Sequence, residues 1–217
     1  MSESLAYDRR MGNREDLLAG ARRVIVERGV AKATARDIAT EAGVSLAAIG
    51  YHFGSKEQLI TEALMESLGD GIGDSMEAVV GETAALPLLD GFAALWNRMP
   101  EVFAANREPL LASLDNTVRV LRDPEASRHL AEAAGEGYLG IAEQLRAARP
   151  ELSDEQVDAV AKLDFALVQS LGILWLLAPD RLPSGDELAR AVAVIAGAEP
   201  PAGVGRVAKR IETLPVE

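Results

Sequence analysis

The stretch T-A-R-D-I-A-T-E-A-G-V-S-L-A-A-I-G-Y-H-F-G-S-K-E-Q-L, residues 34–59, decides the fold of this chain. Thr34 and Asp37 have the spacing of a capping box, in which a hydroxyl and an acid satisfy the first backbone N–H groups of a helix. The helix that starts there is broken by Gly43. Ser45 is placed to cap a second short helix. The pattern therefore predicts two short helices joined by a tight turn.

The residues where these two helices cross are small or apolar in the order that a helix-turn-helix needs. A large side chain at Ala39 would push the second helix away, and Gly43 can take the positive φ of the turn. Val44 and Ile49 close the small core beneath. This geometry turns residues 45–52 outward, as the element that enters a DNA major groove.

Helical patterns flank this unit on both sides. Apolar residues recur at three- and four-residue spacing over residues 12–28, and Gly29 follows where a helix end favours a positive φ. On the other side, Ser55 and Gln58 form a further capping box, which starts a fourth helix. We therefore expect an N-terminal three-helix DNA-binding domain over residues 1–55.

The remainder of the chain is also helical in pattern, without strand alternation or repeats. Ser153–Gln156 and Ser184–Glu187 are capping boxes that support the last two helix starts. The predicted segments, several of them bounded by prolines, are 86–99, 101–106, 109–122, 125–147, 153–178 and 186–197. We predict an all-α protein with a helical effector-binding and dimerisation domain over residues 56–200, and a flexible tail over residues 201–217.

Charge is divided unevenly along the chain. The net charge is −12, yet residues 1–60 carry nine Lys and Arg against eight Asp and Glu, a net +1 that leaves −13 for the remainder. This asymmetry suits an N-terminal part that approaches a polyanion. The chain has no cysteine, which fits the cytoplasm. The longest uncharged run, residues 165–179, is shorter than the roughly 20 residues of a membrane span, so we expect no membrane association.

Together the residues 34–59 and their flanks resemble the DNA-binding signature of TetR-type transcriptional regulators. The resemblance covers about residues 12–65. It implies an all-α homodimer with an N-terminal helix-turn-helix and a larger C-terminal domain that senses a small-molecule effector. It also implies contacts to phosphate or the groove edge from five residues: Thr34, Arg36, Tyr51, His52 and Lys56. Phenol, imidazole and ammonium groups can all donate hydrogen bonds to phosphate oxygens.

Base reading departs from the pattern of many relatives, which place a long polar, aromatic or basic side chain at the first outward positions. Here these positions are Leu46, Ala47 and Gly50. We expect specificity from close backbone approach at Gly50, from contact of Leu46 or Ala47 with thymine methyl groups, and from Ser45. Arg36 is a further candidate for guanine, and DNA shape can add to the readout.

The segment 153–178 becomes apolar on every side after Asp164, and such a helix must be buried all round. Burial between its own domain and a second copy of the chain would satisfy it, whereas the alternative is the central core helix of a monomer. The residues predicted for a dimer interface are Ala166, Leu167, Ser170, Leu171, Leu174, Leu188, Val192 and Ile195. A homodimer would also select an inverted-repeat site in double-stranded DNA.

An effector pocket is less visible in the sequence. The residues predicted to line one are Trp96, Met99, Phe103, Leu111, Asp115, Val118 and Phe165. Residues at this helical spacing are also consistent with a plain hydrophobic core.

We find no signature of an enzyme. The chain lacks a nucleophile elbow, a phosphate-cradling glycine loop and an H-E-x-x-H motif, so we expect no catalytic residue, metal or cofactor. The prediction is a ligand-responsive, DNA-binding transcriptional regulator, with repression as the expected sign. The alternative is a helix-turn-helix-shaped protein-interaction or ligand-binding protein without DNA function.

Overall fold

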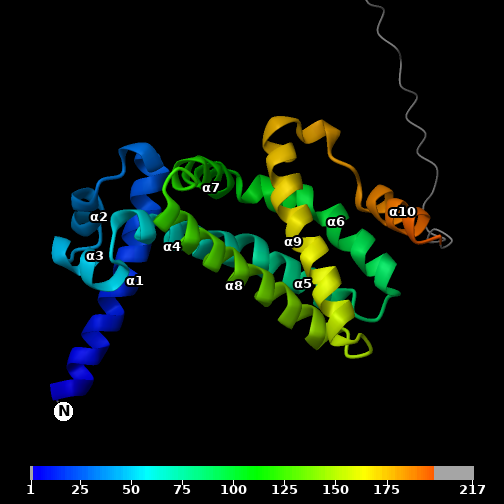
Figure 1. Cartoon of the computed structure of the whole chain (residues 1–217), viewed down its shortest axis with the longest axis horizontal. Coiled ribbons are helices and arrows are strands. Elements are labelled where there is room, and N and C mark those ends of the chain that lie inside the picture. Colours follow the sequence, from blue (N-terminus) through cyan, green and yellow to red (C-terminus); the bar gives the residue numbers. More distant parts are fainter. Residues whose placement is uncertain (1, 198–217) are drawn as a thin grey trace, which may run out of the picture.

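The computed structural model of the protein describes residues 2–197 (Figure 1). This part of the chain is built from helices, which confirms the predicted all-α fold. The N-terminal helices are α1 (Ser2–Arg28), η1 (Val30–Lys32), α2 (Ala35–Glu41), α3 (Leu46–Phe53) and α4 (Lys56–Leu68). The following elements are η2 (Gly69–Gly73), α5 (Asp74–Glu82), α6 (Leu88–Ala105), α7 (Arg107–Val120), α8 (Pro124–Ala148), α9 (Asp154–Leu177), η3 (Pro179–Arg181) and α10 (Gly185–Ala196).

The helices α1 to α4 share one hydrophobic core. Ile38 and Ala39 of α2 and Ile49 of α3 are buried, and Val44 packs against them from the turn. Gly43 has φ 69°, as the turn requires. The predicted helix-turn-helix therefore closes around the residues that the sequence indicated.

Helix α4 belongs to this core and also reaches into the C-terminal part. Its residues Leu59 and Ala63 are fully buried with α1 to α3. On its other side, Asn116 of α7 donates a hydrogen bond to the Thr61 hydroxyl over 3.0 Å, with both side chains buried. Gln58 lies 2.6 Å from His129 of α8 between their side-chain nitrogens. Helix α4 thus joins the N-terminal helices α1 to α3, which we call the head, to the C-terminal helices.

Two further cores organise the C-terminal part. Trp96 and Phe103 of α6 are fully buried in a cluster that includes Leu171 of α9. Residues of α8 and α9 form the second, smaller cluster around Leu145 and Val157. Helix α10 packs along α6, at the end of the molecule away from α1 to α3 (Figure 1).

Several local expectations are confirmed and several are wrong. The capping boxes at Thr34, Ser153 and Ser184 are present, and Ser55 accepts from the Gln58 backbone N–H. Ser45 occupies the N-cap position of α3, but its side chain makes no capping bond. Helix α1 begins ten residues before the predicted start at residue 12.

The break predicted between residues 99 and 101 is also wrong. Helix α6 continues through Pro100, although proline removes one helical hydrogen bond. Met99 before it and Phe103 after it are both buried, and this packing keeps one helix where the local rule predicts two. Helix α5 lies outside the predicted segments, next to the glycine-containing η2. The tail predicted over residues 201–217 lies outside the described residues.

Candidate nucleic-acid interface and effector cavity

The outward face of α3 carries large apolar and aromatic side chains in the open. Leu46 is 50% exposed and Tyr51 is 67% exposed, and Ser45, Ala47 and Gly50 beside them are also exposed. The buried side of the same helix is formed by Ile49 and Phe53. The predicted base-reading residues therefore lie together on one exposed surface.

Gly50 has no structural role that the fold explains. A Cβ atom built there meets nothing within 4 Å. Gly50 lies inside α3 and does not have a positive φ, so its backbone has the ordinary geometry of a helix. Glycine inside a helix costs roughly 0.5–1 kcal/mol relative to alanine. Alanine would fit at this position and would stabilise the helix. The exposed backbone at Gly50 is therefore consistent with close approach by another molecule.

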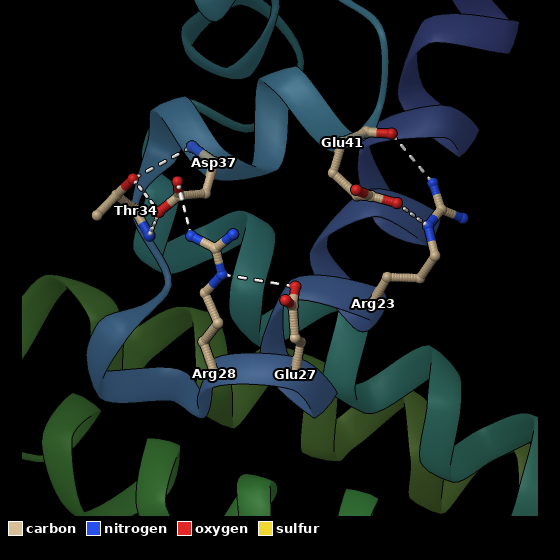
Figure 2. A network of polar contacts seen from close by, with 6 residues as sticks. All are labelled: Arg23, Glu27, Arg28, Thr34, Asp37 and Glu41. Atoms are coloured by element: carbon tan, nitrogen blue, oxygen red, sulfur yellow. Dashed lines mark hydrogen bonds and ion pairs between the residues drawn. The ribbon is translucent and has the colours of Figure 1, made fainter.

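A network of polar contacts fixes α2 against α1 (Figure 2). Arg28 reaches Asp37 over 3.0 Å, and Arg23 contacts the Glu41 carboxylate over 2.6 Å. The hydrogen bond from the Thr34 hydroxyl, followed by the charge of Arg28, holds the pKa of Asp37 below its usual value. These contacts set the orientation of the supporting helix beneath α3.

The residues predicted to contact phosphate flank the exposed face and differ in the contacts that they make within the chain. Arg36 is exposed, whereas the Thr34 hydroxyl already donates to Asp37. Tyr51 and His52 pack edge to face with ring centroids 4.9 Å apart. Lys56 is half-buried, and its ammonium lies 3.3 Å from the Ala33 carbonyl oxygen.

Phe53 faces inward, unlike its two aromatic neighbours. It is 4% exposed, and the Arg14 guanidinium carbon lies 5.2 Å from its ring centroid. Phe53 therefore fills the joint between α3 and the core shared with α1 and α4.

A cavity of about 210 Å³ that is partly open to solvent lies among the C-terminal helices, and we name it the Asp164 cavity. Its wall is apolar apart from Thr83, Arg149 and Asp164. The lining comes from the end of α5, from α6, α8, α9 and α10: Val80, Thr83, Leu88, Leu89, Gly91, Phe92, Leu95, Leu145, Arg149, Val160, Leu163, Asp164 and Val192.

Asp164 is the unusual group of this cavity. It is 6% exposed and accepts one hydrogen bond, from the Trp96 indole nitrogen over 3.2 Å. Burial raises the pKa of Asp164 to about 7, against the smaller opposing effect of the Trp96 bond. The carboxyl group is therefore close to half-ionised near neutral pH.

Arg149, the other charged group of the lining, is held by the chain itself. Its guanidinium donates to the Leu86 carbonyl over 2.6 Å and to the Thr83 carbonyl over 3.1 Å. It also lies 3.8 Å from the Glu151 carboxylate. Arg149 thus ties the connection between α5 and α6 to the end of α8.

None of the seven residues predicted for an effector pocket lines the Asp164 cavity. Trp96, Met99 and Phe103 are buried in the core of α6. Leu111 and Asp115 line a different cavity of about 530 Å³ between α1, η1, α4 and α7. The remaining two are Val118, which is 51% exposed, and the half-buried Phe165.

Sequence reasoning did not find Asp164 or Arg149 as cavity residues. A signal for Asp164 was present, because it is a lone acid directly before the apolar part of the segment 153–178. For Arg149 there was none, since its partners lie more than sixty residues earlier in the chain.

The predicted dimer residues occupy mixed positions. Ala166, Ser170 and Ile195 are exposed, and Ile195 reaches 86%. Leu171 is buried, and four others are half-buried: Leu167, Leu174, Leu188 and Val192. Val192 faces the Asp164 cavity.

Comparisons with known proteins agree with this geometry. Residues 17–63 match the family described as "Bacterial regulatory proteins, tetR family". The transcriptional repressor KstR2 of Rhodococcus jostii (strain RHA1) is 40% identical over 68 residues, which are 31% of this chain and 33% of that protein. The repressor Rv1474c of Mycobacterium tuberculosis (strain ATCC 25618 / H37Rv) is 28% identical over 88% of this chain and 93% of its own length. Two other curated relatives are matched over about a third of their own length.

Solved structures show the same fold over most of the chain. The multidrug binding protein EbrR complexed with imidazole has a TM-score of 0.61 at 24% identity, covering 88% of this chain and 97% of that one. A TetR-family regulator from Mesorhizobium loti MAFF303099 has a TM-score of 0.57 at 20% identity, covering 87% and 96%. This chain and the two solved structures thus share one fold, with an N-terminal helix-turn-helix and a C-terminal helical domain.

Proposed function

We propose that this chain, whose N-terminal domain belongs to the TetR family of bacterial regulatory proteins, is a cytoplasmic, sequence-specific transcriptional regulator. It binds an inverted-repeat site in double-stranded DNA as a homodimer, and a small-molecule effector bound in the C-terminal domain controls that binding. Repression is the expected sign, because occupancy of a promoter is enough to block transcription. The relatives are transcriptional regulators rather than enzymes.

The exposed face of α3 is the observation that carries the proposal. The side chains of Leu46 and Tyr51 are exposed on a helix that packs firmly on the core. Between them, Gly50 leaves the helix backbone uncovered, although glycine lowers helix stability. Exposed backbone and side chains on one rigid helix face fit the approach of another macromolecule. The near-neutral charge of residues 1–60, beside the −13 of the remainder, favours a polyanion as that partner.

Site selection from a random duplex library is the experiment that tests DNA binding. We expect the purified protein to enrich an inverted repeat, and the double variant Tyr51→Ala/Lys56→Ala to lose the enrichment. Affinity for the selected site should fall steeply with salt, with a slope of about −0.9 per phosphate neutralised. Lys162→Ala, which removes the same charge from exposed α9, is the control and should select the same repeat.

A failure to select any DNA sequence would favour the alternative function, a helix-turn-helix that does not bind DNA. If no sequence is enriched at low salt and the two variants behave like the wild-type protein, the helix-turn-helix serves protein interaction or shape alone. The C-terminal domain would then be the functional part.

A homodimer is proposed from the apolar surface of α9. Residues Leu163, Ala166, Ser170, Ile173 and Leu177 are all exposed and recur at alternating spacings of three and four, which places them on one helix face. Helix α9 is long and apolar enough to cross a membrane by length and composition, as core helices of soluble proteins also are, and only 22% of its apolar window is buried. A second copy of the chain would cover this face, together with Val194 and Ile195 of α10.

Ile173→Glu/Leu177→Glu is expected to convert the proposed dimer into a monomer, because two carboxylates would be desolvated in each half of the interface. Sedimentation equilibrium at micromolar concentration measures the change in mass. Val118→Glu replaces an apolar residue of similar exposure on α7 and should leave the mass unchanged. An unchanged dimer in the double variant would place the interface elsewhere.

Coupling between effector and DNA is proposed to pass through α4. This helix shares the head core through Leu59 and contacts α7 and α8 through Thr61 and Gln58. A shift of the C-terminal helices on effector binding would therefore move the two heads of a dimer relative to each other. The domain boundary at residues 55 and 56 remains part of this proposal, with α4 serving both sides.

A further inference from the structure

The Asp164 cavity contains a carboxyl group for which no ion pair with a cationic side chain is found among residues 2–197. We infer that this cavity binds a compact lipophilic molecule carrying one protonated amine, which pairs with the Asp164 carboxylate. This inference rests on the proposed ligand-sensing function and names the chemical class of the ligand.

The cavity suits a small apolar body. At about 210 Å³ it is somewhat larger than the roughly 150 Å³ cavity that accepts a benzene molecule and smaller than most drug-sized pockets. Leucine, valine and phenylalanine side chains from α6, α8 and α9 form most of its wall. A ligand of one or two rings therefore fits the space.

The bonding of Asp164 leaves one place for a donor. Its Oδ1 accepts from the Trp96 indole, and among the described residues no other side chain donates to the carboxylate. Buried polar side-chain atoms without a partner are likewise absent from the described part of the chain, so the second oxygen is not sealed off from accessible space, and Asp164 is one of the residues that line the cavity. Oxygens of an ionised carboxylate can accept several hydrogen bonds.

Among the described residues, Arg149, the other charged residue of the lining, makes no bond to Asp164 and is held by other groups. Its guanidinium is committed to the Thr83 and Leu86 carbonyl oxygens and lies beside Glu151. Apart from Arg149 and Asp164, the residues of the lining carry no ionisable side chain. The Asp164 carboxylate would repel an acidic ligand, whereas a cation would neutralise it.

The same geometry makes binding depend on pH. Since burial raises the pKa of Asp164 to about 7, the group carries a proton in much of the population at pH 6 and must release it to pair with a cation. We therefore expect the affinity for an amine to rise about tenfold between pH 6 and pH 8.

Calorimetric titration of the full-length protein tests the inference with a matched pair of probes, 1-naphthylmethylamine and 1-naphthylmethanol. The amine should bind at least tenfold more tightly than the alcohol at pH 8. Asp164→Asn should remove this preference, because asparagine keeps the shape and can accept the Trp96 bond but carries no charge. Asp154→Asn, which removes a charge from the exposed start of α9, is the control and should keep the preference.

A second readout does not depend on how the variant folds. For the wild-type protein at pH 6, titrations in buffers of different ionisation enthalpy should show proton release on amine binding and none on alcohol binding. Equal affinities for the two probes, no binding of either, or an undiminished amine preference in Asp164→Asn would each overturn the inference. Operator binding by the wild-type protein is measured separately by site selection, so its failure would reject the proposed regulator and leave the ligand class standing.

Discussion

Asp164→Asn is expected to stabilise the protein at pH 8 by about 2 to 4 kcal/mol. The reason is that the carboxyl group has a pKa of about 7 in the folded protein against an ordinary value of 3.8, and this difference corresponds to roughly 4 kcal/mol of penalty on the ionised form. Asparagine carries no such charge and can keep the hydrogen bond from Trp96. Urea unfolding of both proteins at pH 8 measures the difference.

The sign of the pH dependence follows from the raised pKa. Between about pH 4 and pH 7 the folded protein holds a proton on Asp164 that the unfolded chain has lost, so wild-type stability from this group is lost as pH rises through that window. The advantage of Asp164→Asn should therefore shrink at pH 5. Asp154→Asn, at an 89% exposed side chain, should show no comparable change. A stabilisation of equal size at pH 5 and pH 8 would contradict the assignment.

Gly185→Ala is expected to destabilise the protein by about 1 to 3 kcal/mol, the usual cost of overpacking. A Cβ atom at Gly185 would lie 2.0 Å from the Ala93 carbonyl oxygen and 2.6 Å from the Asn97 backbone nitrogen. Both are backbone atoms of α6, so no side chain can move aside. The start of α10 would have to separate from α6 and would weaken the bond from the Gly185 N–H to Asn97. The change is measured by urea unfolding at neutral pH.

Gly140→Ala provides the matched control for this substitution. Gly140 lies in the middle of α8, where a Cβ atom meets nothing within 4 Å. Alanine there should stabilise the protein by about 0.5 to 1 kcal/mol, because it restricts the unfolded chain and favours the helix. The same change, glycine to alanine, should thus lower the free energy of unfolding at residue 185 and raise it at residue 140. If both variants gained stability, the close packing of α10 on α6 would be wrong.

Pattern within a few residues was enough to predict the helix-turn-helix near the N-terminus. Thr34 and Asp37 satisfy the first turn of α2 with their own side chains, and Gly43 takes the positive φ of the turn. These interactions join neighbours in the chain, so their spacing is visible in the sequence. The outward position of Leu46, Gly50 and Tyr51 follows from the buried position of Ile49 and the period of a helix.

The bounds of the C-terminal helices were predicted less well because the contacts that decide them join distant residues. Pro100 predicted a helix break, but burial of Met99 and Phe103 keeps α6 continuous. Six of the seven residues predicted for an effector pocket are apolar positions on helices, and local periodicity does not say which apolar face meets a core and which meets a cavity. Leu111 and Asp115 consequently lie in a different cavity from Asp164.

The sequence by itself determined most of the helices, the capping boxes at Thr34, Ser153 and Ser184, and the helix-turn-helix, because these depend on hydrogen bonds and periodicity within a few residues of chain. The tertiary structure alone decided that Trp96 meets Asp164, sixty-eight residues later, and that Gly185 touches the backbone of α6. Such contacts depend on how whole helices pack, since close packing joins residues according to shape in space and leaves no fixed spacing in the sequence.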